Sequence, residues 1–298
     1  MTTNKRRDWA RIGFYGSLVA MVVWGVVVES FFFVRHDYQA QIPGLPDGCE
    51  GVKIAVTSDW HVGSPHMRKE RARKKAHQVA QSQPDLILIP GDFVAHGLMA
   101  QTMKIEEIGS VLGALPKAAP TYAVLGNHDH VNHSVEAMVR GLQDASIIPL
   151  ENASAVVSLR NGACQFQLVG IGDDFWGAAV PVKAFVGVDA EQPVVAMTHS
   201  PTLYPGVGKR VDLLIAGHTH GGTACVPGTR RCISGAPKWG SPWIKGIYHT
   251  PGTRGAMLVS NGIGNSIIPL RFGAPPGYEV ITLRKSDDRV AHLTKRKD

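Results

Sequence analysis

Polar side chains of the types that bind metals follow five short apolar runs of the chain. The runs with their endings are KIAVTSDWH (residues 53–61), DLILIPGD (85–92), TYAVLGNHD (121–129), VVAMTH (194–199) and DLLIAGHTH (212–220). Together they supply Asp59, His61, Asp92, Asn127, His199, His218 and His220. Any one of these residues alone is readily explained as a turn or capping residue, but the same ending on five runs indicates a shared site.

Each run has the length and composition of a β-strand that is buried on both faces, being four to six residues rich in Val, Ile, Leu and Ala. A polar stretch typical of a helix, residues 66–83, follows the first run. Strands that alternate with helices predict an α/β domain with a largely β-α-β layout, in which ligands bind beyond the carboxyl ends of the strands. The layout therefore gathers the seven side chains at one rim.

Carboxylate, amide and imidazole groups in one place favour a divalent metal ion. Seven ligands exceed what one ion can use while it keeps a water molecule, whereas two ions about 3.5–4 Å apart that share a carboxylate use them well. Asp92 or Asp59 would be the bridge, because here only a carboxylate serves two cations comfortably. Mixed nitrogen and oxygen ligands admit Mn²⁺, Zn²⁺ or Fe and leave the identity of the metal open.

The ordered blocks DWH, GD, GNHD, TH and GHTH resemble the signature of the calcineurin-like metallophosphoesterases. The resemblance runs from about Val52 to Leu283. Three longer segments, QPDLILIPGDFV, GHTHGG and SNGIGNSIIPLRFGAPP, are similar to the membrane-associated bacterial branch of that superfamily. This branch contains phosphodiesterases and enzymes that cleave the pyrophosphate of UDP-2,3-diacylglucosamine.

The resemblance implies a four-layer α/β/β/α sandwich with the metals at the rim between the sheets. It implies two ligand sets that share Asp92. The first set is Asp59, His61, Asp92 and His220, and the second is Asp92, Asn127, His199 and His218.

The resemblance also implies a mechanism. A hydroxide that bridges the metals attacks phosphorus in line while the metals neutralise the phosphoryl oxygens. His128 would protonate the leaving oxygen as the general acid, and Asp129 would orient His128 and keep it charged.

Other residues near the motifs have no role that the sequence supplies. His130 and His133 are interpreted as loop residues, and His66 and His96 either line the cleft or are ordinary loop histidines. Trp60, inside D-x-H, either shapes the rim or packs in the core. After GHTHGG the sequence continues as TACVPGTRRC, which departs from the family and leaves the substrate side of the site open.

The N-terminal part of the chain predicts a membrane anchor. Residues 12–34 form an apolar run with a single charge, Glu29, and 17 residues precede that charge, which is about the minimum for a span. Lys5, Arg6, Arg7 and Arg11 precede the run. The positive-inside rule then places the N-terminus in the cytoplasm and the large domain outside a bacterial inner membrane. The alternative is a domain on the cytoplasmic face.

The expected organisation has five parts: a basic flank (1–11), a transmembrane helix (12–34), a Pro/Gly-containing linker (35–51), the metallophosphoesterase domain (52–284) and a charged C-terminal tail (285–298). Of the four cysteines, Cys225 and Cys232 lie in one short loop where a disulfide is feasible in an oxidising compartment. Cys49 and Cys164 cannot be paired from sequence alone.

Two further segments allow two interpretations each. Residues 68–77 hold six Lys or Arg against one Glu, which is either a solvated helix face or a contact with anionic headgroups. Residues 238–248 contain Trp239, Trp243, Ile244 and Tyr248, which either pack on the sheet or enter the membrane interface.

The sequence as a whole predicts a membrane-anchored dinuclear phosphoesterase that hydrolyses a phosphodiester or pyrophosphate. Its substrate would be a phosphate-containing small molecule or a lipid-linked one. The net charge of +7 fits an anionic partner, but a membrane anchor disfavours nucleic acid. The first alternative is a UDP-2,3-diacylglucosamine pyrophosphatase of lipid A synthesis. The alternative from another class is a non-catalytic scaffold with the same fold, which the complete ligand set disfavours.

Overall fold

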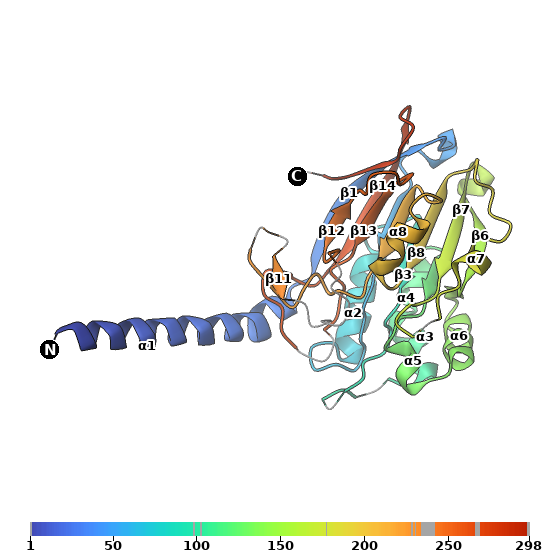
Figure 1. Ribbon diagram of the computed structural model, residues 1–298. Helices are drawn as coiled ribbons and strands as arrows, with labels where there is room; N and C mark the ends of the chain where they lie inside the picture. Colours follow the sequence, from blue (N-terminus) through green and yellow to red (C-terminus); the bar gives the residue numbers. More distant parts are fainter. Residues whose placement is uncertain are drawn as a thin grey trace.

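Two mixed β-sheets packed face to face form the centre of the protein (Figure 1). The computed structural model describes residues 2–97, 99–101, 103–176, 178–227, 229, 231–233, 242–265 and 269–296. Within these residues the larger sheet has seven strands in the order β15-β1-β14-β2-β3-β4-β5, and the smaller has six in the order β12-β13-β9-β8-β7-β6. A separate two-stranded ribbon is formed by β10 (Ala224–Cys225) and β11 (Cys232–Ile233).

The five apolar runs of the sequence are central strands of these sheets. The larger sheet consists of β1 (Val34–Pro43), β2 (Lys53–Val56), β3 (Leu86–Pro90), β4 (Thr121–Val124), β5 (Ile148–Pro149), β14 (Gly277–Ser286) and β15 (His292–Lys295). The smaller sheet consists of β6 (Ala153–Leu159), β7 (Cys164–Ile171), β8 (Val194–Thr198), β9 (Leu213–Ala216), β12 (Gly246–Tyr248) and β13 (Ala256–Val259). Strands β2 to β5 run parallel, as do β7, β8, β9 and β13, so their carboxyl ends meet at common edges.

Helices cover the outer face of each sheet. On the larger sheet these are α2 (Lys69–Ala80), α3 (Ile108–Leu112), α4 (Ala114–Ala118) and α6 (Val135–Asp144), and on the smaller sheet α7 (Pro181–Ala184) and α8 (Tyr204–Val207). The remaining helical turns are α5 (Asp129–Asn132) and short turns at Trp24–Val28, Glu29–Phe31, Asp47–Cys49, Ile105–Glu107, Arg160–Gly162 and Pro201–Leu203.

Alternation along the strands builds three apolar cores between four layers. Ile54 and Val56 of β2 point into the core between the sheets, where they join Leu168 of β7. Ala55, between them, faces the other way and packs in the core beneath α2 to α6. Because side chains alternate across a strand, a sheet buried on both faces needs apolar residues at every position. The predicted four-layer α/β/β/α sandwich is therefore confirmed.

The predicted linker is wrong over much of its length. Residues 34–43 form strand β1, which pairs in parallel with β14 and antiparallel with β15. Tyr38, Ala40 and Ile42 point into the core, a period-two pattern that identifies a half-buried strand. The Pro and Gly residues at 43–48, which are typical of a linker, belong only to the end of the strand and the turn that follows it.

The predicted C-terminal tail is likewise part of the sheet. Strand β14 continues to Ser286, and β15 returns along β1 with Leu293 in the core. The edge strand β15 is short and polar at its exposed positions, which end with Lys295, and natural sheets use short edge strands with lysine to prevent pairing with another chain.

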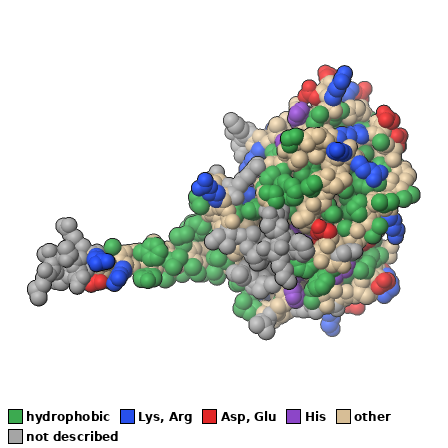
Figure 2. Space-filling model, in the orientation of Figure 1, with side chains coloured by type: hydrophobic (Ala, Val, Ile, Leu, Met, Phe, Trp, Pro, Cys, Tyr) green, Lys and Arg blue, Asp and Glu red, His purple; other side chains and the backbone are tan. Residues whose placement is uncertain are grey.

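Helix α1 (Thr2–Val23) projects from the domain by itself (Figure 1). The helical segment Arg7–Phe31 is long and apolar enough to cross a membrane. Figure 2 shows apolar side chains along the helix and charged ones towards its N-terminal end. The helix is thus an apolar segment of sufficient length for a span, and its role as a membrane anchor stays a prediction.

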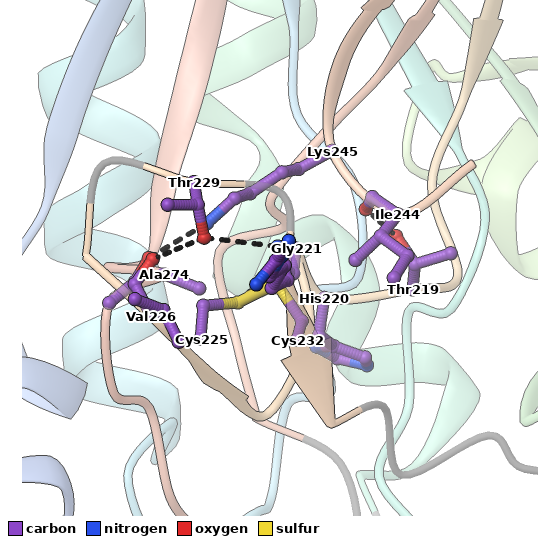
Figure 3. The surroundings of a disulfide bond; sticks show 12 residues. Thr219, His220, Gly221, Cys225, Val226, Thr229, Cys232, Ile244, Lys245 and Ala274 are labelled. Atoms are coloured by element: carbon purple, nitrogen blue, oxygen red, sulfur yellow. Dashed lines mark hydrogen bonds between the residues drawn. A yellow bond between two sulfur atoms is a disulfide. The ribbon is translucent and has the colours of Figure 1, made fainter. Parts of the chain in front are cut away.

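Both disulfides can be assigned from the structure. Cys225 and Cys232 pair across the β10–β11 ribbon, seven residues apart (Figure 3). Cys49, in the turn before β2, pairs with Cys164 at the start of β7, so this disulfide joins the two sheets across 115 residues of sequence.

We predict that the two disulfides differ in their effect on stability. Opening the long loop in a Cys49→Ala/Cys164→Ala variant should lower the free energy of unfolding by about 5 kcal/mol, and opening the short one in Cys225→Ala/Cys232→Ala by about 2 kcal/mol, because loop-closure entropy grows with loop length. Thermal unfolding of the two variants, followed by near-ultraviolet circular dichroism, measures the difference. Equal losses of thermal stability in the two variants would contradict the predicted dependence on loop length.

Candidate functional site

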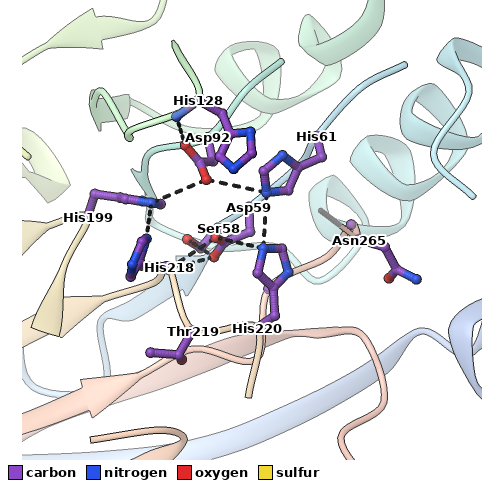
Figure 4. Close-up of polar contacts among 12 residues, drawn as sticks. Ser58, Asp59, His61, Asp92, His128, His199, His218, Thr219, His220 and Asn265 are labelled. Atoms are coloured by element: carbon purple, nitrogen blue, oxygen red, sulfur yellow. Dashed lines mark hydrogen bonds and ion pairs between the residues drawn. The ribbon is translucent and has the colours of Figure 1, made fainter. Parts of the chain in front are cut away.

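The seven predicted ligands lie together at the rim where the strands of both sheets end. Figure 4 labels six of them, and the seventh, Asn127, contacts His199 and His218. Asp59 and His61 follow β2, Asp92 follows β3, Asn127 follows β4, His199 follows β8, and His218 and His220 follow β9. The side chains form two groups.

The first group contains Asp59, His61, Asp92 and His220, whose ligand atoms all lie within 4.8 Å of one another. Nε2 of His61 lies 3.0 Å from Nε2 of His220 and 3.3 Å from Oδ2 of Asp92. Nε2 of His220 lies 3.6 Å from Oδ1 of Asp59. Two carboxylates and two imidazole nitrogens directed at one point are a donor set that fits a divalent cation.

The second group contains Asn127, His199 and His218. Oδ1 of Asn127 lies 3.0 Å from Nε2 of His199 and 2.9 Å from Nδ1 of His218. Nε2 of His199 also lies 3.2 Å from Oδ2 of Asp92, the same oxygen that faces His61. One carboxylate oxygen therefore stands between the two groups.

Burial sets the charge of the site. It lowers the pKa of His61 to about 3 and that of His218 to about 4, so both rings are neutral and able to bind a cation. It raises the pKa of Asp59 to about 6. Burial would also raise the pKa of Asp92, but His199 holds it well below its usual value, and Asp92 in turn raises the pKa of His199 against the effect of burial. The ionised carboxylates are thus destabilised by burial, and a bound cation would stabilise them.

Five of the candidate ligands have a backbone in the left-handed region. Their φ angles are 54° for Asp59, 42° for His61, 60° for Asp92, 71° for His218 and 53° for His220. Each such residue costs about 1–2 kcal/mol relative to the ordinary conformation. Strain of this kind persists where the surrounding structure enforces it and gathers at functional sites.

Neighbouring groups hold these ligands in place. Ser58 donates its hydroxyl to Asp59 Oδ2 at 2.5 Å. His199 Nδ1 donates to the carbonyl oxygen of Pro90 at 2.8 Å, which directs Nε2 into the site. Gly91 and Gly126 lie so close together that a Cβ on Gly91 would come within 2.6 Å of the Gly126 nitrogen. The glycines of the GD and GN motifs thus let two ligand loops touch.

Asp129 is bound by backbone N–H groups of two ligand loops. Its carboxylate accepts four backbone N–H bonds, from Asp92, Phe93, Val94 and Gly126, at 2.8–3.2 Å. These bonds tie the loop after β3 to the loop after β4, and the expected role of Asp129 in orienting His128 stays a prediction. A fully buried carboxylate needs several donors, and four N–H groups supply them.

The imidazole of His128 instead lies against His96, with the two Nδ1 atoms 2.7 Å apart. The backbone N–H of His128 donates to Asp92 Oδ1 at 2.8 Å, which places His128 directly beside the shared carboxylate. His96 therefore belongs to the site, whereas His66 lies away from it against Asn265. Buried Nε2 atoms of His130 and His133 have no hydrogen-bond partner within the described part of the chain.

Of the tryptophans near the motifs, Trp60 and Trp243 pack within the protein. Trp60 is fully buried and donates to Thr57, so it packs in the core. Trp243 lies edge-on to Tyr204 and, with Tyr248, packs beside the core of the smaller sheet. Trp239 lies outside the described residues.

Two aromatic residues at the site were missed by sequence reasoning. Trp176 is 57% exposed and donates its indole N–H to the carbonyl oxygen of Asn127 at 3.0 Å. The ring of Phe175 lies 6.2 Å from that of His218. Both follow the end of β7, but the sequence rule selected metal-binding side chains after apolar runs and therefore passed over two aromatic ones.

The family of the protein follows from its similarity to known proteins. Residues 52–222 match the calcineurin-like phosphoesterases. The chain belongs to this family. The metallophosphoesterase YkuE of Bacillus subtilis is 26% identical over 300 residues, which are 96% of this chain and 100% of that protein. The phosphodiesterase YaeI of Escherichia coli is 35% identical over 150 residues, 49% of this chain and 53% of that protein. The UDP-2,3-diacylglucosamine pyrophosphatase LpxG of Chlamydia muridarum is 23% identical over 278 residues, 76% of this chain and 82% of that protein.

The match confirms the predicted family and its general activity. This metallophosphoesterase is a metal-dependent hydrolase of phosphate esters. Its cluster of Asp59, His61, Asp92 and His220 is able to hold a metal ion.

The contacts of Asp129 lead to a prediction that separates it from His128. An Asp129→Asn variant should lose most of its bound metal, because an amide nitrogen replaces one acceptor and faces N–H donors of both ligand loops. A His128→Ala variant should keep its metal, since the His128 side chain is not in either group. Metal per chain after dialysis and reconstitution, measured by inductively coupled plasma mass spectrometry, tests both. If Asp129→Asn keeps its full metal content and loses only activity, the result supports the role of Asp129 in orienting His128 and contradicts a role in metal binding.

Proposed function

We propose that the protein is a membrane-anchored dinuclear phosphoesterase that hydrolyses a phosphodiester or pyrophosphate in or near the bilayer. The observation that carries the proposal is the single oxygen of Asp92 between two groups of ligands. A carboxylate in this position suits two cations. One would be held by Asp59, His61, Asp92 and His220, and the other by Asp92, Asn127, His199 and His218.

Two bound divalent ions supply a water molecule of lowered pKa and neutralise charge on the phosphoryl oxygens. Residues of the chain do the rest. His128 donates a proton to the leaving oxygen, and its backbone N–H bond to Asp92 fixes its distance from the site. The contact with His96 holds the ring of His128 in one orientation. Asp129 acts through the loops, which it keeps in register.

The apolar segment Arg7–Phe31 supports anchoring in a membrane. The two relatives named above as a phosphodiesterase and a UDP-2,3-diacylglucosamine pyrophosphatase support the two forms of substrate. A lipid-linked phosphoester is thus a natural substrate for an anchored enzyme, and cleavage of UDP-2,3-diacylglucosamine remains the alternative. The metal is Mn²⁺, Zn²⁺ or Fe, in keeping with mixed nitrogen and oxygen ligands.

Two features support a domain outside the cytoplasm. Basic residues precede the apolar segment, which favours a cytoplasmic N-terminus. All four cysteines are paired, and disulfides persist in oxidising compartments. A substrate on the outer face of an inner membrane fits this topology better than the cytoplasmic nucleotide-sugar alternative does.

A non-catalytic scaffold is disfavoured by the strained backbone at five candidate ligands. Such strain lowers stability and would be lost where it has no use. A scaffold would also be expected to lack some of the ligands, and this chain holds all of them close together.

We predict that the full-length protein in detergent hydrolyses bis-p-nitrophenyl phosphate only when Mn²⁺ or Zn²⁺ is restored after chelation. Asp92→Ala should remove both activity and bound metal, because both groups lose a ligand. His128→Ala should keep its metal and lose about 10²–10⁴ in kcat, the usual contribution of a general acid. His77→Ala, on the exposed face of α2, is the matched control and should be fully active.

Activity that survives chelation, or full metal content in Asp92→Ala, would overturn the proposal. Release of UMP from UDP-2,3-diacylglucosamine by the same preparation would decide for the pyrophosphatase alternative. Metal-free protein without any hydrolysis would favour the scaffold.

A further inference from the structure

One side of the last turns of the apolar helical segment packs against the catalytic domain. Side chains from Arg7 to Trp24 are exposed, but Gly25, Glu29 and Ser30 are buried. A Cβ on Gly25 would meet Leu270 at 2.5 Å and the carbonyl oxygen of Arg271 at 2.9 Å. The helix therefore touches the domain by its backbone at this point, where only glycine fits.

Hydrogen bonds hold the buried end of the helix. Glu29 accepts from the backbone N–H of Ala274 at 2.8 Å and from the indole of Trp24 at 3.2 Å. Asn265 donates to the hydroxyl of Ser30 at 3.0 Å. The single charge of the apolar run is thus paired within the protein. We call the contacts of Gly25, Glu29 and Ser30 with Asn265, Arg271 and Ala274 the anchor joint.

Arg271 connects the anchor joint to the candidate metal centre. Its backbone N–H donates to the carbonyl oxygen of Gly25 at 3.2 Å. Its guanidinium, which is 1% exposed, contacts the backbone oxygen of His220 and lies 3.0 Å from Nδ1 of the same ring, and it also donates to Asn265 at 3.1 Å. A single residue therefore separates a candidate ligand from the apolar helical segment.

The segment that connects the apolar helix to the sheet is very short. Only Phe32 and Phe33 separate the helical turn ending at Phe31 from strand β1. Phe33 stacks on Tyr278 of β14 with ring centroids 5.1 Å apart, and the guanidinium of Arg71 from α2 lies 4.1 Å above Phe31. The helical turn and strand β1 are thus joined by two residues, and contacts with the domain hold this connection on both sides.

Length places the joint at the membrane surface. The segment Arg7–Phe31 has 25 residues and is about 37 Å long as a helix, more than the roughly 30 Å of a hydrocarbon core. If its N-terminal basic residues lie among headgroups, its last two turns, from Gly25 onward, lie at the opposite boundary. Arg71 beside Phe31 is then at the depth of anionic headgroups, where a basic side chain is stabilised.

We propose that the anchor joint fixes the catalytic centre at the level of the lipid headgroups, so that the enzyme acts on a phosphoester whose other substituent stays in the bilayer. This inference rests on the proposed phosphoesterase function. A domain on a flexible tether would meet water-soluble and membrane-bound esters alike. A docked domain holds its centre where only the membrane-bound ester is concentrated.

Two esters with the same scissile group test the proposal, methyl p-nitrophenyl phosphate and hexadecyl p-nitrophenyl phosphate. The full-length protein is reconstituted in vesicles of digalactosyldiacylglycerol, which contain no competing phosphoester. Gly25→Leu forces the joint apart, since the added side chain meets Leu270 and Arg271. Gly16→Leu is the matched control, because a Cβ on Gly16 meets nothing within 4 Å. Both variants keep the anchor and all candidate ligands.

The native protein and Gly16→Leu should prefer the hexadecyl ester by about tenfold or more in kcat/KM, and Gly25→Leu should lose most of this preference while it still cleaves the methyl ester. An unchanged preference in Gly25→Leu overturns the role of the joint. Failure of the native protein to cleave either ester with metal restored counts against the phosphoesterase function itself.

A depth measurement tests the joint independently of activity. The described cysteines are all in disulfides, so a spin label on a single introduced cysteine is unique. Val226, 55% exposed, directly follows β10 (Figure 3). Backbone hydrogen bonds from Cys225 to Phe272 and from Arg271 to Gly25 connect this part of the ribbon to the end of the apolar segment. Val182, 80% exposed, belongs to α7, which lies on the far side of the domain (Figure 1). A label at Val226→Cys should be shielded from a water-soluble nickel chelate and one at Val182→Cys should not. Equal access at both positions overturns the proposal, and a Gly25→Leu background should expose the Val226→Cys label.

Discussion

The carboxylate of Asp92 is the interaction on which the rest of the site depends. One of its oxygens faces His61 and His199, and the other accepts the backbone N–H of His128. A buried carboxylate with so many neighbours is stable only if each neighbour is held in place. The loops after β2, β3, β4 and β8 are therefore arranged around one side chain, and the parallel strands that end at this rim provide the starting points from which they can reach it.

Backbone hydrogen bonds and close contacts, more than side-chain packing, keep these loops in position. Asp129 binds N–H groups of two loops at once, and Gly91 and Gly126 allow those loops to touch. The left-handed conformations of the candidate ligands need such support, because each is unfavourable by itself. The stable sheets thus hold the candidate ligands in place before a cation binds. The ligands therefore lose little conformational entropy on binding.

The sequence predicts those parts of the protein that depend on local patterns. Short apolar runs followed by Asp, Asn or His identify the central strands and the candidate ligands, because burial on both faces and the end of a strand leave clear local signals. Contacts between distant segments leave no such signal. The pairing of Cys49 with Cys164 and the bonds of Asp129 depend on which loops meet in space. Strand β1 did carry an alternating pattern, which was hidden by the Pro and Gly residues that follow it.

Glu29 illustrates how a departure from a local rule marks a structural boundary. A carboxylate near the end of an apolar span is unfavourable in lipid, yet here it accepts hydrogen bonds from Trp24 and Ala274 and is buried in protein. The charge therefore lies where the helix passes from its exposed part into the domain. Because Gly25, on the same turns, accepts a hydrogen bond from Arg271, and Arg271 contacts His220, the end of the apolar helix is close to the candidate metal centre. The helix and the domain thus share contacts at the point where the proposed anchor would leave the membrane.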